Sequence, residues 1–192
     1  MAEECEVKFL NVNIEELETK LKKLGAKKVG EFHYKRRVYD YPDRRLDKKG
    51  AWIRLRTDDK KTTLCYKERI GIKSHDGKTN DKTFHEVEFE VSDFEKAKEF
   101  MDNLGFKEKF YEENTRIRYM LNDIEFDIDT WPLLKPYLEI EAPTWDQVNE
   151  GIKLLELDPK DKKIFSTYQV YQLEGIDEFD FSVLTFAKQI KK

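Results

Sequence analysis

Hydrophobic and polar residues alternate with a period of two through about eight short segments of the chain. Such alternation is typical of β-strands that have one apolar and one polar face. The segments are VKFLNV, VYDYP, AWIRLR, TTLCYKE, HEVEFEV, TRIRYML, IEFDID and YLEIEA. Their spacing and the polar stretch GIKSHDGKTND predict antiparallel pairing, with the longest loop near residues 71–82.

Three stretches between these segments have the signature of amphipathic helices. Each begins with a capping residue followed three positions later by Glu or Gln. The capping pairs are Asn13 with Glu16, Ser92 with Glu95, and Thr144 with Gln147. Glycine follows Leu24 and Leu104, where a helix commonly ends in a left-handed residue. We therefore predict three helices between strands, and a further helical tail over residues 173–192.

Residues 6–39 and 86–119 resemble each other at a fixed offset and are identical at nine of 34 positions. The matches include the glycines that end the two helices, and Arg36 with Arg116. Two repeats are too few for a solenoid, so they favour a pseudo-twofold sheet or barrel. We predict one domain, 1–192, built from half-repeats 1–80 and 81–172 followed by the tail, 173–192.

The polar faces of the predicted strands carry groups of like charge. Charged residues make up 40% of the chain, but the net charge is only -4, so no overall field favours nucleic acid. A solvated face explains any single strand. The set of strands is harder to explain this way, because like charges two apart repel unless something lies between them. These groups are Glu4/Glu6, Arg54/Arg56, Glu86/Glu88/Glu90, Arg116/Arg118, Asp127/Asp129 and Glu139/Glu141.

Amphipathic helices need an apolar surface to cover, which places the apolar strand faces outward and the charged faces inward. We therefore predict an α+β fold: a closed eight-stranded antiparallel β-barrel with a charged lumen and helices outside. One wall would offer oxygen ligands for Mg²⁺ or Mn²⁺, from Glu4, Glu6, Asp129, Glu139 and Glu141. The other would bind a polyanion with several phosphates, through Lys8, Arg54, Arg56, Lys67, Arg116 and Arg118.

Other residue types add little chemistry. Cys5 and Cys65 lack the spacing of a zinc site or disulfide framework, which favours reduced thiols in a cytoplasmic protein. No apolar run is long enough to cross a membrane. For Trp131 and Tyr137, core or rim packing is favoured over contact with a base or thiazole ring. We expect a small molecule that carries several phosphates as partner, no nucleic acid or membrane, and a monomer or homodimer.

The opening segment EECEVKF resembles the Glu-x-Glu-x-Lys signature of the CYTH family. That family contains class IV adenylyl cyclases, thiamine triphosphatase and the triphosphate tunnel metalloenzymes. The similarity continues in order through RRVYDYP, AWIRLR, LCYKE, HEVEFEVSDFEKAKEFMDNLGF, TRIRY and DIDTWPLLKPYLEIEA, from residue 3 to residue 145. The resemblance implies an eight-stranded antiparallel tunnel, a divalent metal on carboxylates and a triphosphate along a basic wall.

Matched residue by residue, the resemblance assigns roles to residues on both walls of the predicted tunnel. It implies metal ligands at Glu4, Glu6, Glu139 and Glu141 and phosphate contacts at Lys8, Arg54, Arg56, Lys67 and Arg116. Asp129 matches the acidic residue ten positions before the closing pair, and Arg118 is added from spacing alone. Glu4, Glu6, Lys8 and Asp129 are the catalytic candidates. The chain departs from the family at Arg36, where Asp is frequent.

The leading hypothesis is a metal-dependent phosphohydrolase that cleaves the terminal phosphoanhydride of inorganic, thiamine or nucleoside triphosphate. One alternative is a class IV adenylyl cyclase that converts ATP to cyclic AMP and pyrophosphate with the same two walls. Some cyclases of the group lack the second glutamate of the closing pair, so the presence of both Glu139 and Glu141 favours hydrolysis. The other alternative is a polyphosphate or nucleotide binding module without turnover.

Overall fold

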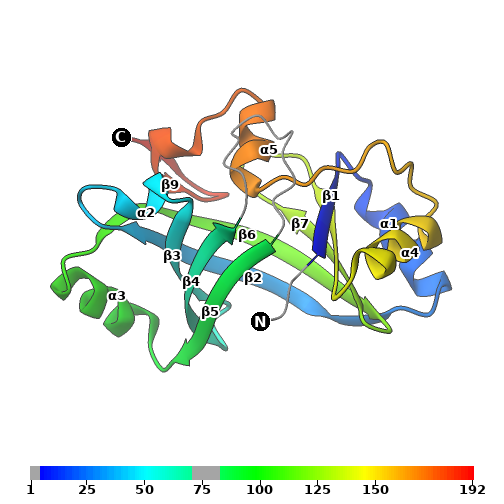
Figure 1. Cartoon of the computed structure of the whole chain (residues 1–192), viewed down its shortest axis with the longest axis horizontal. Coiled ribbons are helices and arrows are strands. Elements are labelled where there is room, and N and C mark those ends of the chain that lie inside the picture. Colours follow the sequence, from blue (N-terminus) through cyan, green and yellow to red (C-terminus); the bar gives the residue numbers. More distant parts are fainter. Residues whose placement is uncertain (1–4, 71–82) are drawn as a thin grey trace.

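The computed structural model describes residues 5–70 and 83–192, which form a mixed α+β fold around one large, strongly curved sheet (Figure 1). Glu4 and the loop expected at 71–82 lie outside the described residues. The strands are β1 (Cys5–Leu10), β2 (Lys27–Asp40), β3 (Ala51–Thr57), β4 (Thr62–Ile70), β5 (Thr83–Val91), β6 (Lys107–Leu121), β7 (Ile124–Thr130), β8 (Tyr137–Ala142), β9 (Phe181–Leu184) and β10 (Gln189–Lys191). The α-helices are α1 (Ile14–Lys23), α2 (Arg45–Lys48), α3 (Phe94–Asn103), α4 (Trp145–Leu154) and α5 (Thr167–Leu173).

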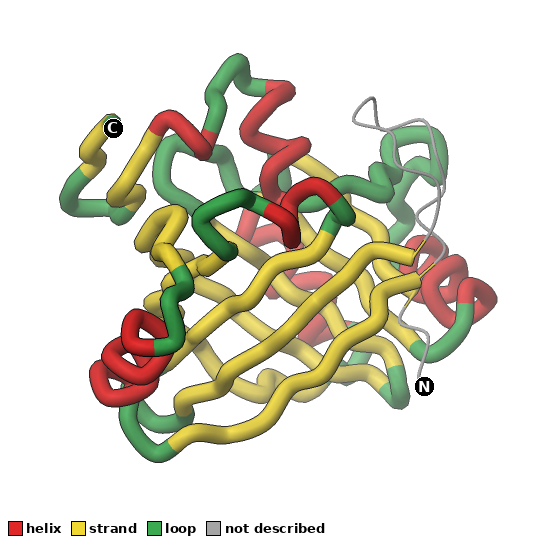
Figure 2. The backbone as a smooth tube through the Cα atoms, turned by 60° about the vertical axis from the view of Figure 1, so that its left-hand side comes forward, coloured by secondary structure: helices red, strands yellow, loops and turns green. Residues whose placement is uncertain are grey.

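The main path of the sheet runs β1-β8-β7-β6-β2-β3-β4-β5, and all of its neighbours pair antiparallel. The long strands β2 and β6 pair at its centre. β2 and β6 are the second strands of the two predicted repeats, residues 6–39 and 86–119. The repeat itself and the division into domains stay predictions. Figure 2 shows strands at the front crossing those behind, so the sheet wraps around an interior.

The prediction of a closed barrel is wrong in its closure, and the count of eight holds for the main path of the sheet alone. β1 and β5 end the path and do not pair with each other within the described ranges. The sheet has ten strands there, since β9 pairs parallel with β6 and antiparallel with β10. Alternation determines which face a side chain takes, but closure depends on strand tilt and stagger, which a period of two does not encode.

The predicted helical tail is also wrong. α5 ends before Gly175, whose φ of +72° is left-handed, and a single 3-10 turn (Glu178–Asp180) leads into β9. Phe181 and Leu184 are buried at the two ends of β9, which pairs with β6 at Tyr111 and Glu112. By pairing with β6, β9 gives its backbone N–H and C=O groups the hydrogen-bond partners that they would otherwise have found within a helix.

The three predicted helices are confirmed as α1, α3 and α4. Asn13 and Thr144 cap their helices by accepting hydrogen bonds from the backbone N–H groups of Glu16 and Gln147, both at 3.3 Å. The cap of α3 is Asp93 instead of Ser92, and it accepts from the Lys96 N–H at 2.8 Å. Asp93 occupies the position directly before the first helical turn, where a side-chain oxygen reaches the free N–H groups.

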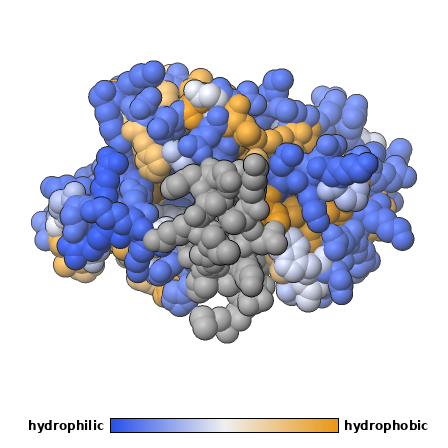
Figure 3. Space-filling model, turned by 45° about the horizontal axis from the view of Figure 1, so that its top comes forward, coloured by the Kyte–Doolittle hydropathy of each residue, from blue (hydrophilic) through white to orange (hydrophobic). Residues whose placement is uncertain are grey.

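The apolar faces of β1, β7 and β8 pack under helices, as expected, whereas Val87 and Phe89 on β5 are about half exposed. Leu17 and Leu21 of α1 and Val148 and Ile152 of α4 belong to one core cluster with the outward residues of β1, β7 and β8. α4 lies close to this surface, because a Cβ atom on Gly151 would approach the Ile140 side chain to 3.0 Å. No helix within the described parts of the chain is long and apolar enough to cross a membrane. The face in Figure 3 is largely hydrophilic, with scattered hydrophobic patches.

Candidate functional site

The inward strand faces line a cavity of about 320 Å³. All six predicted basic residues line it, and so do all the predicted acidic residues that the structure describes. The seven cationic side chains are Lys8, Arg36, Arg54, Arg56, Lys67, Arg116 and Arg118. The seven carboxylates are Glu6, Glu86, Glu88, Glu125, Asp129, Glu139 and Glu141. Since the two sets are equal in number among the residues that the structure describes, the affinity of the cavity for an ion depends on how its charges are paired.

Three of the predicted metal ligands come together. Glu6, Glu139 and Glu141 each place a carboxylate oxygen within 4.8 Å of the other two, and we call them the carboxylate trio. The register of β1 with β8 explains this, because Glu6 pairs with Glu141 and Lys8 with Glu139. The Lys8 Nζ lies 2.9 Å from Glu6 Oε1 and 3.0 Å from Glu139 Oε2.

Within the trio, the electrostatics favour an ionised Glu139. Burial alone would raise the pKa of Glu139, but the charges of Lys8 and Arg116 outweigh it and lower the pKa to about 2. Burial opposes the charge on Lys8 as well, yet Glu139 and Glu6 raise its pKa above the ordinary value. A cluster of ionised carboxylate oxygens is the donor set that Mg²⁺ and Mn²⁺ prefer, so the residues present fit such an ion.

Asp129, the remaining predicted ligand, is placed differently. It is fully buried and forms a two-pronged pair with Arg116, with Nε to Oδ1 at 2.7 Å and Nη2 to Oδ2 at 2.6 Å. Asn114 also donates to Asp129 Oδ1, at 3.3 Å. Its oxygens are therefore committed to an arginine instead of joining the trio. Sequence spacing placed Asp129 on the correct face but carried no information about its cross-strand partner, Arg116.

Arg116 and Arg118 are closely compensated by carboxylates. Arg118 bonds both oxygens of Asp127, at 2.8 and 2.7 Å, and its Nη2 lies 2.6 Å from Glu125 Oε1. Arg116 adds a contact of 2.5 Å with Asp127 to its pair with Asp129. Burial opposes both guanidinium charges, but these carboxylates raise the pKa of each arginine. Their charge is largely neutralised within the protein.

Three other arginines, Arg36, Arg54 and Arg56, form what we call the arginine cluster. Arg54 and Arg56 share Glu88, at 3.2 and 3.5 Å, and Arg54 also lies 3.5 Å from Glu86. Burial, followed by the charges of Arg54 and Arg36, lowers the pKa of Arg56 to about 10. The arginine cluster therefore has a surplus of positive charge that an anion would stabilise.

Arg36 is the one cation among the described cavity residues that the sequence analysis did not assign to the site. Its position matched Arg116 in the repeat, and this match was the signal that could have identified it, since Arg116 was already placed in the site. Trp131, for which packing was favoured, is 4% exposed and lies edge-on to Tyr171 while also lining the cavity. Lys67, the last predicted basic residue, lies 3.0 Å from Glu86.

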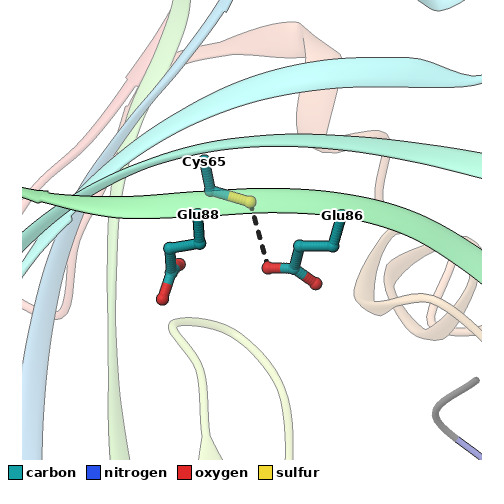
Figure 4. Close-up of side chains that lie close together, drawn as sticks. All are labelled: Cys65, Glu86 and Glu88. Atoms are coloured by element: carbon teal, nitrogen blue, oxygen red, sulfur yellow. Dashed lines mark hydrogen bonds between the residues drawn. The ribbon is translucent and has the colours of Figure 1, made fainter. Parts of the chain in front are cut away.

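A second group of possible ligands, Cys65, Glu86 and Glu88, lies on the neighbouring strands β4 and β5 (Figure 4). The Cys65 thiol donates to Glu86 Oε1 at 3.0 Å. Burial raises the pKa of this thiol to about 12, so the sulfur remains protonated, whereas a metal ligand must be a thiolate. Because both glutamates also contact the arginine cluster, this group fits a cation poorly.

A basic and acidic cavity enclosed by a wrapped antiparallel sheet agrees with the comparisons with known proteins. Residues 2–165 match the CYTH domain, so the chain belongs to the CYTH family. A protein of Methanocaldococcus jannaschii that is provisionally named an adenylate cyclase is 30% identical over 154 residues, which cover 80% of this chain and 83% of that protein.

Solved structures share the fold. The PH1012 protein of Pyrococcus horikoshii has a TM-score of 0.71 and 27% identity, over 87% of this chain and 98% of that one. A Hippeastrum protein, HpAC1, is described as an adenylyl cyclase candidate with a dominant triphosphatase activity. It has a TM-score of 0.64 and 14% identity, over 94% of this chain and 99% of that one, and shows the fold alone.

Proposed function

We propose that this protein is a divalent-metal-dependent phosphohydrolase that cleaves the terminal phosphoanhydride of a triphosphate. One observation carries the proposal: the carboxylate trio and the arginine cluster line the same cavity of about 320 Å³. A triphosphate needs both features, because its negative charges require cations and its reaction requires a divalent ion. Membership of the CYTH family supports this general class of activity.

The trio would hold Mg²⁺ or Mn²⁺ through Glu6, Glu139 and Glu141. When bound, such an ion supplies positive charge beside the phosphate oxygens and makes water more acidic. Lys8 bridges Glu6 and Glu139 and holds its proton firmly, so its role is to donate hydrogen bonds and not to act as a base. Glu4, which lies outside the described residues, remains a candidate ligand.

Arg54, Arg56 and Lys67 would bind the phosphate chain, because guanidinium groups grip phosphate oxygens in pairs. Their present partners, Glu86 and Glu88, contact them at 3.0 to 3.5 Å and would be exchanged in part for phosphate oxygens. Asp129 and Asp127 would hold Arg116 and Arg118 in place, so that these two arginines shape the cavity. Fixed charges of this kind stabilise the transition state without reorganising during the reaction.

The alternative is an adenylyl cyclase, and the name of the Methanocaldococcus jannaschii relative favours it. The same cations and metal ligands would serve, with the ribose 3′-oxygen attacking the α-phosphorus of ATP. Hydrolysis is preferred because the trio is complete, including Glu141. The dominant triphosphatase activity described for the Hippeastrum protein indicates that this fold can favour hydrolysis.

The test is one set of incubations with Mg²⁺ or Mn²⁺ and, separately, inorganic triphosphate, thiamine triphosphate and ATP. Orthophosphate, pyrophosphate and cyclic AMP are then separated and quantified. We expect orthophosphate together with ADP or thiamine diphosphate from the two organic substrates, and equal amounts of orthophosphate and pyrophosphate from inorganic triphosphate. Cyclic AMP with pyrophosphate would establish the cyclase instead, and saturable binding without any product would establish a binding module.

A further inference from the structure

Arg36 lies in the cavity with little to neutralise it. It is 7% exposed, and its Nε has no hydrogen-bond acceptor among the described residues. The closest carboxylate recorded for it is Glu112, whose Oε1 is 3.9 Å from Nε, beyond hydrogen-bond distance. A buried guanidinium without close carboxylates is costly unless a ligand completes its environment.

Neutral groups, in contrast, hold Arg36 firmly. Its Nη2 donates to the Asn114 side-chain oxygen, and its guanidinium lies 4.4 Å from the centre of the Trp131 ring and 5.9 Å from that of Tyr34. An amide and two aromatic faces orient a cation while leaving its full charge in place. Arg116 is oriented by aspartate and so is neutralised as it is held.

The sheet register adds Arg36 to a cluster of like charge. Arg36 of β2 pairs directly with Arg56 of β3, and Arg54 lies two residues further along the same face of β3. The Arg56 guanidinium lies 4.7 Å from the ring of Tyr34, whose ring also faces Arg36. Directly opposed like charges destabilise a sheet, so this arrangement indicates an anionic ligand between them.

We propose that Arg36, together with Arg54 and Arg56, binds the terminal, unesterified phosphate of the substrate and selects for its second negative charge. The inference rests on the proposed function and names its substrate class: phosphate chains with at least one free end. A terminal phosphate is close to a dianion at pH 8, because its second pKa is about 6, whereas an esterified phosphate keeps one charge. Chains esterified at both ends, such as dinucleoside triphosphates, would be excluded.

The test compares ATP with its γ-methyl ester, which differ by one charge at the terminal phosphate. Dissociation constants are measured by calorimetry at pH 8 in EDTA, where no metal-dependent turnover occurs. We expect the wild type to bind ATP at least about tenfold more tightly than the ester, the scale of one charge-assisted hydrogen bond. In Arg36→Gln this preference should fall to nearly one, and Arg36→Lys should restore part of it.

Arg37→Gln is the matched control. Arg37 is the next residue in β2, but it does not line the cavity and bonds Glu108 at 2.8 Å. This variant should keep the wild-type preference for ATP. Equal weakening of both compounds by Arg36→Gln would indicate a structural role and overturn the proposal, as would a wild type that binds neither compound. Failure of the proposed function would show separately, as a lack of product from any triphosphate with Mg²⁺ or Mn²⁺.

Discussion

The two sides of the cavity treat their positive charges differently. On β6, β7, β8 and β1, each of Arg116, Arg118 and Lys8 has a carboxylate oxygen within 3.0 Å. On β2 and β3, the carboxylates that face the arginine cluster stand 3.2 to 3.9 Å away. An equal count of charges therefore conceals one neutralised side and one with surplus positive charge. The affinity for an anion depends on the quality of the ion pairs, because a well-paired cation has little charge left to offer.

The largest expected effect concerns the neutralised side, where the trio would bind the metal. Glu139→Gln should lower metal-dependent kcat/KM by about 10²–10³-fold or more, because it removes a charged ligand and a partner of Lys8. Kinetics with Mg²⁺ and Mn²⁺ measure the loss, and circular dichroism verifies the fold. Glu108→Gln is the control, since Glu108 pairs with Arg37 and does not line the cavity. A Glu139→Gln variant with full activity would refute the proposed metal site.

The next effect contrasts the two sides directly. Asp129→Asn should lower the free energy of unfolding by about 3 kcal/mol, because it leaves Arg116 buried without its two-pronged partner. Glu88→Gln should cost about 1 kcal/mol or less, since the Glu88 side chain is 30% exposed and makes longer contacts with its two arginines. Urea denaturation of both variants measures the difference. Similar losses for the two variants would mean that the sides do not differ in their pairing.

The smallest effect depends on pH and on Glu112, the carboxylate facing Arg36. Burial outweighs the nearby charge of Arg36 and raises the pKa of Glu112 from 4.5 to about 6. A carboxyl that holds its proton better when folded contributes stability below about pH 4.5, and this contribution is lost as the pH rises through 6. Relative to the wild type, Glu112→Gln should therefore become more stable by about 2 kcal/mol between pH 4.5 and 7.5.

Unfolding free energies of the wild type and Glu112→Gln at these two pH values test this prediction. The difference between the two proteins is informative, because titrating groups that do not interact with Glu112 contribute equally to both; Glu178, whose pKa is raised by burial and by Glu112, shares in the difference. If that difference stays constant with pH, Glu112 titrates normally and is a better counterion for Arg36 than its 3.9 Å distance indicates.

The sequence by itself determined which side chains face inward. A period of two is a property of the extended backbone, so Glu6, Glu139, Arg54 and Arg116 could be assigned to one face before any strand was paired. Helix starts were local as well, since a cap and its N–H partner lie three residues apart, and only the cap of α3 was displaced by one residue. The resemblance to the CYTH family then connected these faces to a chemistry.

Only the tertiary structure decided which inward charges touch. Glu6 and Glu139 lie more than a hundred residues apart and meet because β1 pairs with β8 in one register. Asp129 joins Arg116 and not the trio, and Arg36 remains without a close carboxylate, for the same reason. Closure of the sheet and the strand pairing of the tail were decided at this level too. Pairing, stagger and burial arise between distant segments, and the local pattern of a strand does not contain them.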